Sequence, residues 1–385
     1  MHPAAVAAFN DALKVWANPA AAHAAGQAAS AAIEEERAFL LSLLRPMAGI
    51  KAQETTGDAL LFTSSLTEAN NMIWRGLKRL KTAPAEIFFS PADHPSLTAV
   101  ADFYKDDPTI KVRPLPLKQG LVDEEAFYAQ LGPQTQLVLL SSVNNTCGVI
   151  NPVARLSREI KKRAAQAWIH LDHGQGFLKQ TLGAHCLDSI ALPSSKIGGP
   201  GGIAGLWVRD PAALAPWLWG GGHEYGLRAS SLSLPLIKAW AAAVRAQQDD
   251  LAEEQLGRAS KALKQGFKDA LQAAAQAVFF PVESASQEDA PEVSPYLLLA
   301  VFPQVSSDIL MRYLEREDLM VAASSACSSH IAGYSPVLAA LGLAEQFHKN
   351  VLRFSWAPTT TAAELACVAQ RVGFHYKELR RFAGR

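Results

Sequence analysis

The residue best placed for covalent chemistry is a lysine in a glycine-rich turn. Lys196 lies in Ser194–Gly202 (SSKIGGPGG), directly after the apolar stretch Ser189–Leu192. A turn of small residues lets a ligand approach closely and removes water from the amine, and these conditions favour a Schiff base with a carbonyl compound. An ordinary flexible loop with a solvated lysine is the alternative, and this segment alone favours that simpler interpretation.

An acid ends another apolar stretch, Trp168–Asp172 (WIHLD). A buried carboxylate needs a cationic partner, and a pyridinium nitrogen is one such partner. His170 and His173 beside Asp172 also raise the possibility of a metal site. Side chains alternate along a strand, so His170 and Asp172 can share a site while His173 points away. Because no further ligand set is evident, no metal site is predicted.

Two further segments are expected at the same edge of a sheet. Thr63–Asn71 (TSSLTEANN) joins a strand to a helix, where backbone amides and hydroxyl groups can hold a phosphate. A plain helix N-cap is the alternative. His94 follows the expected strand Glu86–Ser90, although a lone histidine is more often structural.

The C-terminal third contributes a thiol and a guanidinium. Cys327 lies among small polar residues in Ala323–Ser329, which suggests an exposed nucleophile rather than a packed core residue. Arg353 lies in the strand-like Val351–Ser355. We expect it to be buried and to pair with a carboxylate from the substrate or from the protein.

The elements that would position these residues alternate between strands and helices. Helical patterns such as Thr67–Leu80 and Val153–Ala165 separate the strands, and this alternation predicts a mostly parallel sheet with helices on both faces. Ligands bind such sheets at the carboxyl ends of the strands. The expected strands are Ala59–Thr63, Glu86–Ser90, Gln136–Ser141, Trp168–Asp172, Ser189–Leu192 and Ile203–Val208.

A long helical stretch, Leu234–Val278, ends this pattern. It is followed by the strand-like Tyr296–Phe302, the helical Ser307–Arg316 and a last helix from Thr360. We therefore expect a large α/β domain over residues 1–250. A smaller α+β domain, carrying Cys327, is expected over residues 251–385.

The composition excludes several classes of protein. Lys plus Arg (36) equal Asp plus Glu (36), so no net charge favours nucleic acid or a membrane surface. The four cysteines form no CxxC pair, which argues against a disulfide framework and a zinc site. No apolar run reaches the ~18 residues of a membrane helix, and the N-terminus does not resemble a signal peptide. A cytoplasmic protein is expected.

In their order, these motifs resemble those of the class V aminotransferase superfamily, which are PLP-dependent (pyridoxal 5'-phosphate) enzymes of fold type I. They are closest to cysteine desulfurases that supply sulfur for iron–sulfur clusters. The matching segments are Asn18-Pro19 with His23 and Gly26, Thr63–Asn71, His94-Pro95, Asn144-Asn145 with Gly148, Asp172 with Gln175, Lys196–Pro200, Gly220–Arg228, Ser324–Ser329 with Ala340–Gly342, and Arg353.

The resemblance implies that PLP is the cofactor and that Lys196 holds it as a Schiff base. Asp172 would keep the ring nitrogen protonated, and His94 would stack on the ring. Ser231 would reach the phosphate across a homodimer. The residues placed at the cofactor are Thr67, His94, Asn145, Asp172, Gln175, Ser195, Lys196 and Ser231.

The resemblance also implies a reaction, the conversion of L-cysteine to L-alanine. Asn145 and Arg353 would bind the substrate, while Lys196 and His94 would act in catalysis. Cys327, as a thiolate, would take the sulfur as a persulfide. A sulfur-acceptor protein would then receive it, for iron–sulfur cluster assembly or another use.

Two other functions stay open because the chain departs from the family in places. Pro193-Ser194-Ser195 stands where relatives usually have Ser-Gly-His, and the chain begins after the strand and loop that line the substrate site in relatives. One alternative is another class V enzyme, a lyase or transaminase, with Cys327 incidental. The other is a divergent, non-catalytic paralogue that binds partners. A pure scaffold would have no physical need to keep Lys196, Asp172, Gln175, His94, Cys327 and Arg353 together.

Overall fold

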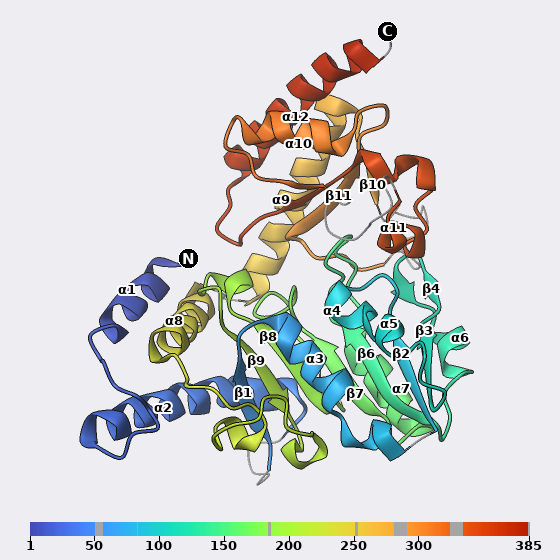
Figure 1. The fold of residues 1–385 in the computed structure, drawn as a ribbon. Helices are drawn as coiled ribbons and strands as arrows, with labels where there is room; N and C mark the ends of the chain where they lie inside the picture. Colours follow the sequence, from blue (N-terminus) through green and yellow to red (C-terminus); the bar gives the residue numbers. More distant parts are fainter. Residues whose placement is uncertain are drawn as a thin grey trace.

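The computed structural model shows a large α/β unit with a smaller α+β unit above one edge of its sheet (Figure 1). The residues described are 1–50, 57–82, 84–183, 186–250, 253–280, 291–323 and 334–383.

The large unit is built on a seven-stranded sheet of order β1-β9-β8-β7-β6-β2-β3. β9 runs antiparallel to both of its neighbours and the other pairings are parallel, which confirms the expected mostly parallel sheet. Four of the strands, β1, β7, β8 and β9, are buried along their whole length, so their sequences are nearly continuous apolar runs. The strands are β1 (Ala59–Thr63), β2 (Ala85–Phe89), β3 (Ile110–Pro114), β6 (Thr135–Ser141), β7 (Trp168–Asp172), β8 (Ser189–Pro193) and β9 (Ala204–Val208).

Helices cover both faces of this sheet, and alternate strand residues pack on opposite sides. Leu60 and Phe62 of β1 belong to the core under one layer of helices, whereas Ala59 and Leu61 belong to the core under the other. The first layer contains α1 (Pro3–Ala12), α2 (Ala24–Met47), α6 (Glu124–Tyr128), α7 (Val153–Arg163) and α8 (Leu234–Asp250). The second contains α3 (Leu66–Gly76), α4 (Pro95–Thr98) and α5 (Val100–Phe103). A small hairpin pairs β4 (Leu117–Lys118) with β5 (Leu121–Val122).

The smaller unit is a four-stranded antiparallel sheet of order β10-β11-β13-β12. One face packs against long helices, whereas Leu299, Val301 and Val351 on the other face pack with Cys147 and Val149 of the large unit. This second contact places the unit over the carboxyl ends of the large sheet. Its elements are α9 (Glu253–Ala275), β10 (Val278–Phe280), β11 (Leu297–Val301), α10 (Ser307–Glu315), β12 (Ala322–Ala323), α11 (Pro336–Ala340), β13 (Val351–Ser355) and α12 (Ala362–Ala383). A domain boundary between residues 250 and 251 stays a prediction.

Three sequence expectations differ from the structure. The helical stretch expected over Leu234–Val278 is present as α8 and α9 but ends earlier, since α9 ends at Ala275 and β10 begins at Val278. The edge strand β3 was not expected, although Ile110–Pro114 (IKVRP) alternates apolar and charged residues as a half-buried strand does. The helix α3 ends at Gly76 rather than at Leu80 because a short 3-10 turn follows it.

No helix in the described part of the chain is both long enough and apolar enough to cross a bilayer.

Candidate active site

Seven of the expected cofactor residues line one cavity at the carboxyl edge of the large sheet. The cavity has a volume of about 250 Å³. The strands β1, β2, β6, β7 and β8 end at this edge, and each contributes residues from the turn that follows it. The seven residues are Thr67, His94, Asn145, Asp172, Gln175, Ser195 and Lys196.

Lys196 lies in a single 3-10 turn, Ser195–Ile197, directly after β8. Gly198 ends the turn with a φ of 82°, which only glycine adopts easily. Burial lowers the pKa of the Lys196 amine, and Arg353 lowers it further, while Asp172 opposes both effects. The site therefore favours the neutral amine, which is the nucleophilic form.

Asp172 and Lys196 meet across a glycine. The Asp172 Oδ1 atom accepts a hydrogen bond of 2.8 Å from the backbone N–H of Gly174. A Cβ atom at Gly174 would lie 2.7 Å from Asp172 Oδ1 and 3.1 Å from Lys196 Nζ. Gly174 is therefore required by the close approach of the acid and the amine.

His94 is placed by the start of α4. Its Nδ1 atom caps the helix, since it accepts from the Ser96 backbone N–H at 3.1 Å and lies 2.8 Å from Ser96 Oγ. Burial lowers the pKa of His94, so the ring is neutral and carries its proton on Nε2. The Nε2–H group is then the part of the ring left to act in the cavity.

A second cavity of about 240 Å³ adjoins the first and shares four of its residues: His94, Asn145, Gln175 and Lys196. The smaller unit contributes Arg353 to it, together with Ala322 and Ala323. The Arg353 Nη1 group donates a 2.9 Å hydrogen bond to the backbone carbonyl of Asn145. Arg353 is half-buried rather than fully buried as expected, because it faces this cavity.

Comparison with known proteins identifies the family. A profile of the class-V aminotransferases matches residues 3–368 of the chain. The chain belongs to this family. A NifS/IcsS protein homolog of Lactobacillus delbrueckii subsp. bulgaricus is 28% identical over 374 residues, which cover 94% of this chain and 91% of that protein. A protein of Cereibacter sphaeroides named cysteine desulfurase is 28% identical over 364 residues, covering 91% and 86%. An X-ray structure of a NifS-like protein from Rickettsia africae has a TM-score of 0.79 at 25% identity, covering 98% and 96%.

Class-V aminotransferases depend on PLP, which is therefore the cofactor of this chain. The first cavity fits the phosphate group at the N-terminus of α3. The Ser65 hydroxyl caps this helix by accepting a hydrogen bond from the backbone N–H of Glu68. The backbone amides of Leu66 and Thr67 are left to bind an anion. Across the cavity, the Ser194 hydroxyl is buried and has no hydrogen-bond partner among the described residues.

The residues expected at the cofactor ring also lie in the first cavity. Asp172 and Gln175 line it together with Lys196. The expected sharing of a site by His170 and Asp172 is confirmed, since both contact the side chain of Asn70. His173 instead lies 2.8 Å from Ser142. In the described part of the chain, no cluster of three or more metal-ligating side chains is present.

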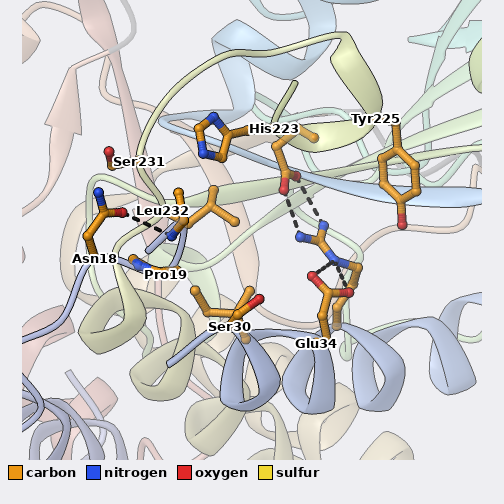
Figure 2. A pocket seen from close by; sticks show the side chains of 12 residues that line it. Asn18, Pro19, Ser30, Glu34, His223, Tyr225, Ser231 and Leu232 are labelled. Carbon is orange, nitrogen blue, oxygen red and sulfur yellow. Dashed lines mark hydrogen bonds and ion pairs between the residues drawn. The ribbon is translucent and has the colours of Figure 1, made fainter. Parts of the chain in front are cut away.

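Two expected residues lie elsewhere. Ser231 lines a separate cavity of about 210 Å³, beside Asn18 and His223 (Figure 2). Arg37 and Glu224, which also line this cavity, form a bidentate ion pair. Cys327, expected as the sulfur-accepting nucleophile, lies outside the described residues.

Three buried residues at the site were missed. Asn70 is in the quoted segment Thr63–Asn71, but nothing in its spacing distinguished it from the half-buried Asn71. Asp93 precedes the expected His94 and is 2% exposed, and burial raises its pKa to about 7. Ser194 was named only as part of longer segments such as Pro193-Ser194-Ser195, where Ser195 was the expected cofactor residue; the structure instead buries Ser194 and leaves Ser195 exposed.

Proposed function

We propose that this chain is a cysteine desulfurase, which converts L-cysteine to L-alanine and takes the sulfur onto Cys327 as a persulfide. The observation that carries the proposal is the pair of adjoining cavities with Lys196 between them. The first suits the cofactor, and the second holds Arg353 where a substrate carboxylate can bind. Relatives that span most of the chain carry the name cysteine desulfurase.

Each residue has a role that follows from its place. Arg353 and Asn145 orient the amino acid by its carboxylate, because a guanidinium forms strong bonds with carboxylates. Asp172 holds a proton on the ring nitrogen. When bound, PLP supplies a ring that accepts electrons from the substrate Cα. Lys196, once free, moves the proton at Cα, and His94 offers a proton from Nε2.

The sulfur step is a displacement by a thiolate. The Cys327 sulfur attacks the sulfur of the substrate, so that an S–S bond forms and the substrate C–S bond breaks. The electron pair of the broken bond stays with the substrate carbon, which is protonated and leaves as part of alanine. Ala323, which lines the second cavity, precedes Cys327 by four residues. We expect the site to assist deprotonation, since a free thiol is mostly protonated at neutral pH.

A homodimer would complete the cofactor site. Ser231 does not line the cofactor cavity of its own chain, and the loop before it is unusually apolar at its surface. Trp219 in this loop is 86% exposed, and Trp16, next to the cavity residue Asn18, is 98% exposed. Exposed apolar patches of this kind mark interfaces. A second copy covering them would bring Ser231 to the partner's phosphate.

We place the enzyme in the cytoplasm, where it would pass persulfide sulfur to an acceptor protein for iron–sulfur cluster assembly or another use. The cysteines Cys147, Cys186 and Cys367 are free, as expected in a reducing compartment. The sulfur acceptor would have to reach the Cys327 thiol.

A single-turnover assay tests the desulfurase activity. The purified protein is loaded with PLP and mixed with L-cysteine, and alanine and protein-bound persulfide are measured for the wild type and Cys327→Ala. We expect both products from the wild type and neither from the variant. A PLP-loaded wild type that forms neither product would contradict the desulfurase proposal and favour the alternative, another class V enzyme that acts as a lyase or transaminase. A protein that cannot bind PLP at Lys196 would favour the scaffold alternative.

A further inference from the structure

A buried amide lies at the centre of a hydrogen-bond chain behind the cofactor cavity. Asn70 of α3 is fully buried. Its Nδ2 group donates to Asp172 Oδ2 at 2.7 Å and to Ser96 Oγ at 2.8 Å. Its Oδ1 atom lies 2.9 Å from Nε2 of His170, which is also fully buried. These contacts join helix α3 to strand β7, about one hundred residues away in the sequence.

The chemistry of the groups sets the direction of each bond. A carboxylate only accepts, so the Asn70 NH₂ group faces Asp172 and its carbonyl oxygen faces His170. His170 must then carry a proton on Nε2. Its Nδ1 atom lies 2.9 Å from Ser189 Oγ and accepts from that hydroxyl, which in turn accepts from Trp168 Nε1–H at 2.8 Å. All donors in the chain are used.

This chain of hydrogen bonds holds the His170 ring in its neutral form. Burial lowers the pKa of His170 to about 4, and Asp172 only partly opposes this effect. An amide between the ring and the carboxylate can orient both groups, but it does not exchange protons between them. The single negative charge of the arrangement therefore stays on Asp172, where the cofactor nitrogen is expected.

We propose that Asn70 is a positioning residue of the cofactor site: its amide keeps Asp172 ionised and aimed at the ring nitrogen of PLP, with His170 fixed as the Nε2–H form. Asn70 acts through Asp172 and has no contact of its own with the reacting atoms. The inference rests on the PLP cofactor and is independent of the cysteine desulfurase proposal.

Replacement by aspartate tests this role with little change of shape. Asn70→Asp puts a second carboxylate at the 2.7 Å that now separates amide and acid. Two carboxylates this close share one proton, as in catalytic acid pairs. Asp172 then carries the negative charge only part of the time, and the ring nitrogen loses a constant partner.

The other charged and titratable groups that interact with Asp172 are few. They come from the turn after β2 (Asp93 and His94), from β7 itself (His170) and from the turn after β8 (Lys196). Burial raises the pKa of Asp93 to about 7, so Asp93 also changes its charge near neutral pH. Its effect on the pH dependence of PLP binding must be removed by comparison with a control variant that retains Asp93. Asn71→Asp is that control, because it makes the same change one residue away, where the side chain is half-buried and bonds to the Thr67 carbonyl.

PLP binding is measured by fluorescence titration of each cofactor-free protein at pH 6.5 and pH 8.5. We expect Asn70→Asp to bind PLP roughly tenfold or more weakly than Asn71→Asp at pH 6.5, since a charged hydrogen bond is lost. The deficit should shrink at the higher pH, because the shared proton is released more completely there. Simple loosening of the fold would weaken binding equally at both pH values, and that result would overturn the proposal, as would equal affinity of the two variants.

A second measurement does not depend on the variant folding. Nitrogen-15 NMR of the histidines in the cofactor-free wild type reports which ring nitrogen carries the proton. We expect His170 as the neutral Nε2–H form down to about pH 5, given its lowered pKa. A proton on Nδ1, or a charged ring at neutral pH, would overturn the hydrogen-bond directions on which the role of Asn70 rests. A wild type that binds PLP but does not desulfurate cysteine would leave the inference intact.

Discussion

The ion pair between Arg37 and Glu224 offers the sharpest test of how the loop Gly220–Arg228 is held in place. Arg37 of α2 makes hydrogen bonds of 2.7 and 3.0 Å to the two carboxylate oxygens of Glu224. The two side chains are 6% and 1% exposed. Glu224 Oε2 also accepts from the Phe62 backbone N–H at 2.5 Å, so the pair ties α2 and the loop to β1. Removal of the cation would leave the anion buried without its partner.

The expected cost follows from this burial. Breaking a buried ion pair by removing one partner costs about 3–5 kcal/mol. Arg37→Met keeps most of the side-chain length and should therefore lower the free energy of unfolding by about that amount. The double variant Arg37→Met/Glu224→Gln removes both charges and should recover much of the loss, because two neutral groups no longer leave an unpaired charge.

Urea unfolding followed by tryptophan fluorescence, at one fixed protein concentration, measures these differences. Arg155→Met is the matched control, because its pair with Glu124 joins side chains that are 63% and 24% exposed. We expect the control to lose less than about 1 kcal/mol. If Arg37→Met loses no more than the control, or if the double variant is as unstable as the single one, the buried pair does not hold the loop as argued.

Three further predictions concern the site and its surroundings. Gly174→Ala should weaken PLP binding measured by titration, because the new Cβ would lie 2.7 Å from Asp172 Oδ1; unchanged affinity would contradict the close approach. The rate of PLP incorporation at Lys196 should level off at a lower pH than the reaction of PLP with free N-acetyl-lysine, since the pKa of Lys196 is lowered; a profile that levels off at the same or a higher pH would refute this. Cys147 should resist iodoacetamide at pH 8 in the folded protein but react in urea, because burial raises the pKa of its thiol to about 12; peptide mapping would reveal early labelling.

Local patterns in the sequence were enough to predict six of the seven strands of the large sheet. Trp168–Asp172 was expected and found with the same bounds, since five consecutive buried residues between turn signals leave few alternatives. The same reasoning found Lys196 after β8, because only a strand end supplies a small-residue turn at the ligand edge. Edge strand β3 was missed because strands were predicted only from continuous apolar runs, whereas this half-exposed strand alternates apolar and charged residues.

Contacts between distant polar groups could not be found in this way. Arg353 meets the backbone of Asn145 across 208 residues, and Arg37 meets Glu224 across 187. Hydrophobic periodicity says which face of an element is buried, but it does not say which polar side chain will lie opposite another. The missed residues Asn70 and Asp93 both take part in such long-range polar contacts, with Asp172 and Ser141 respectively.

The sequence by itself determined the order of strands and helices, the lysine turn and the acid at a strand end, because each depends on neighbours a few residues apart. The tertiary structure decided the rest. It placed the smaller unit over the sheet edge, which brought Arg353 beside Lys196, and it packed α3 against β7, which put the Asn70 amide between His170 and Asp172. Such encounters depend on how whole elements pack, and packing is a property of the complete chain.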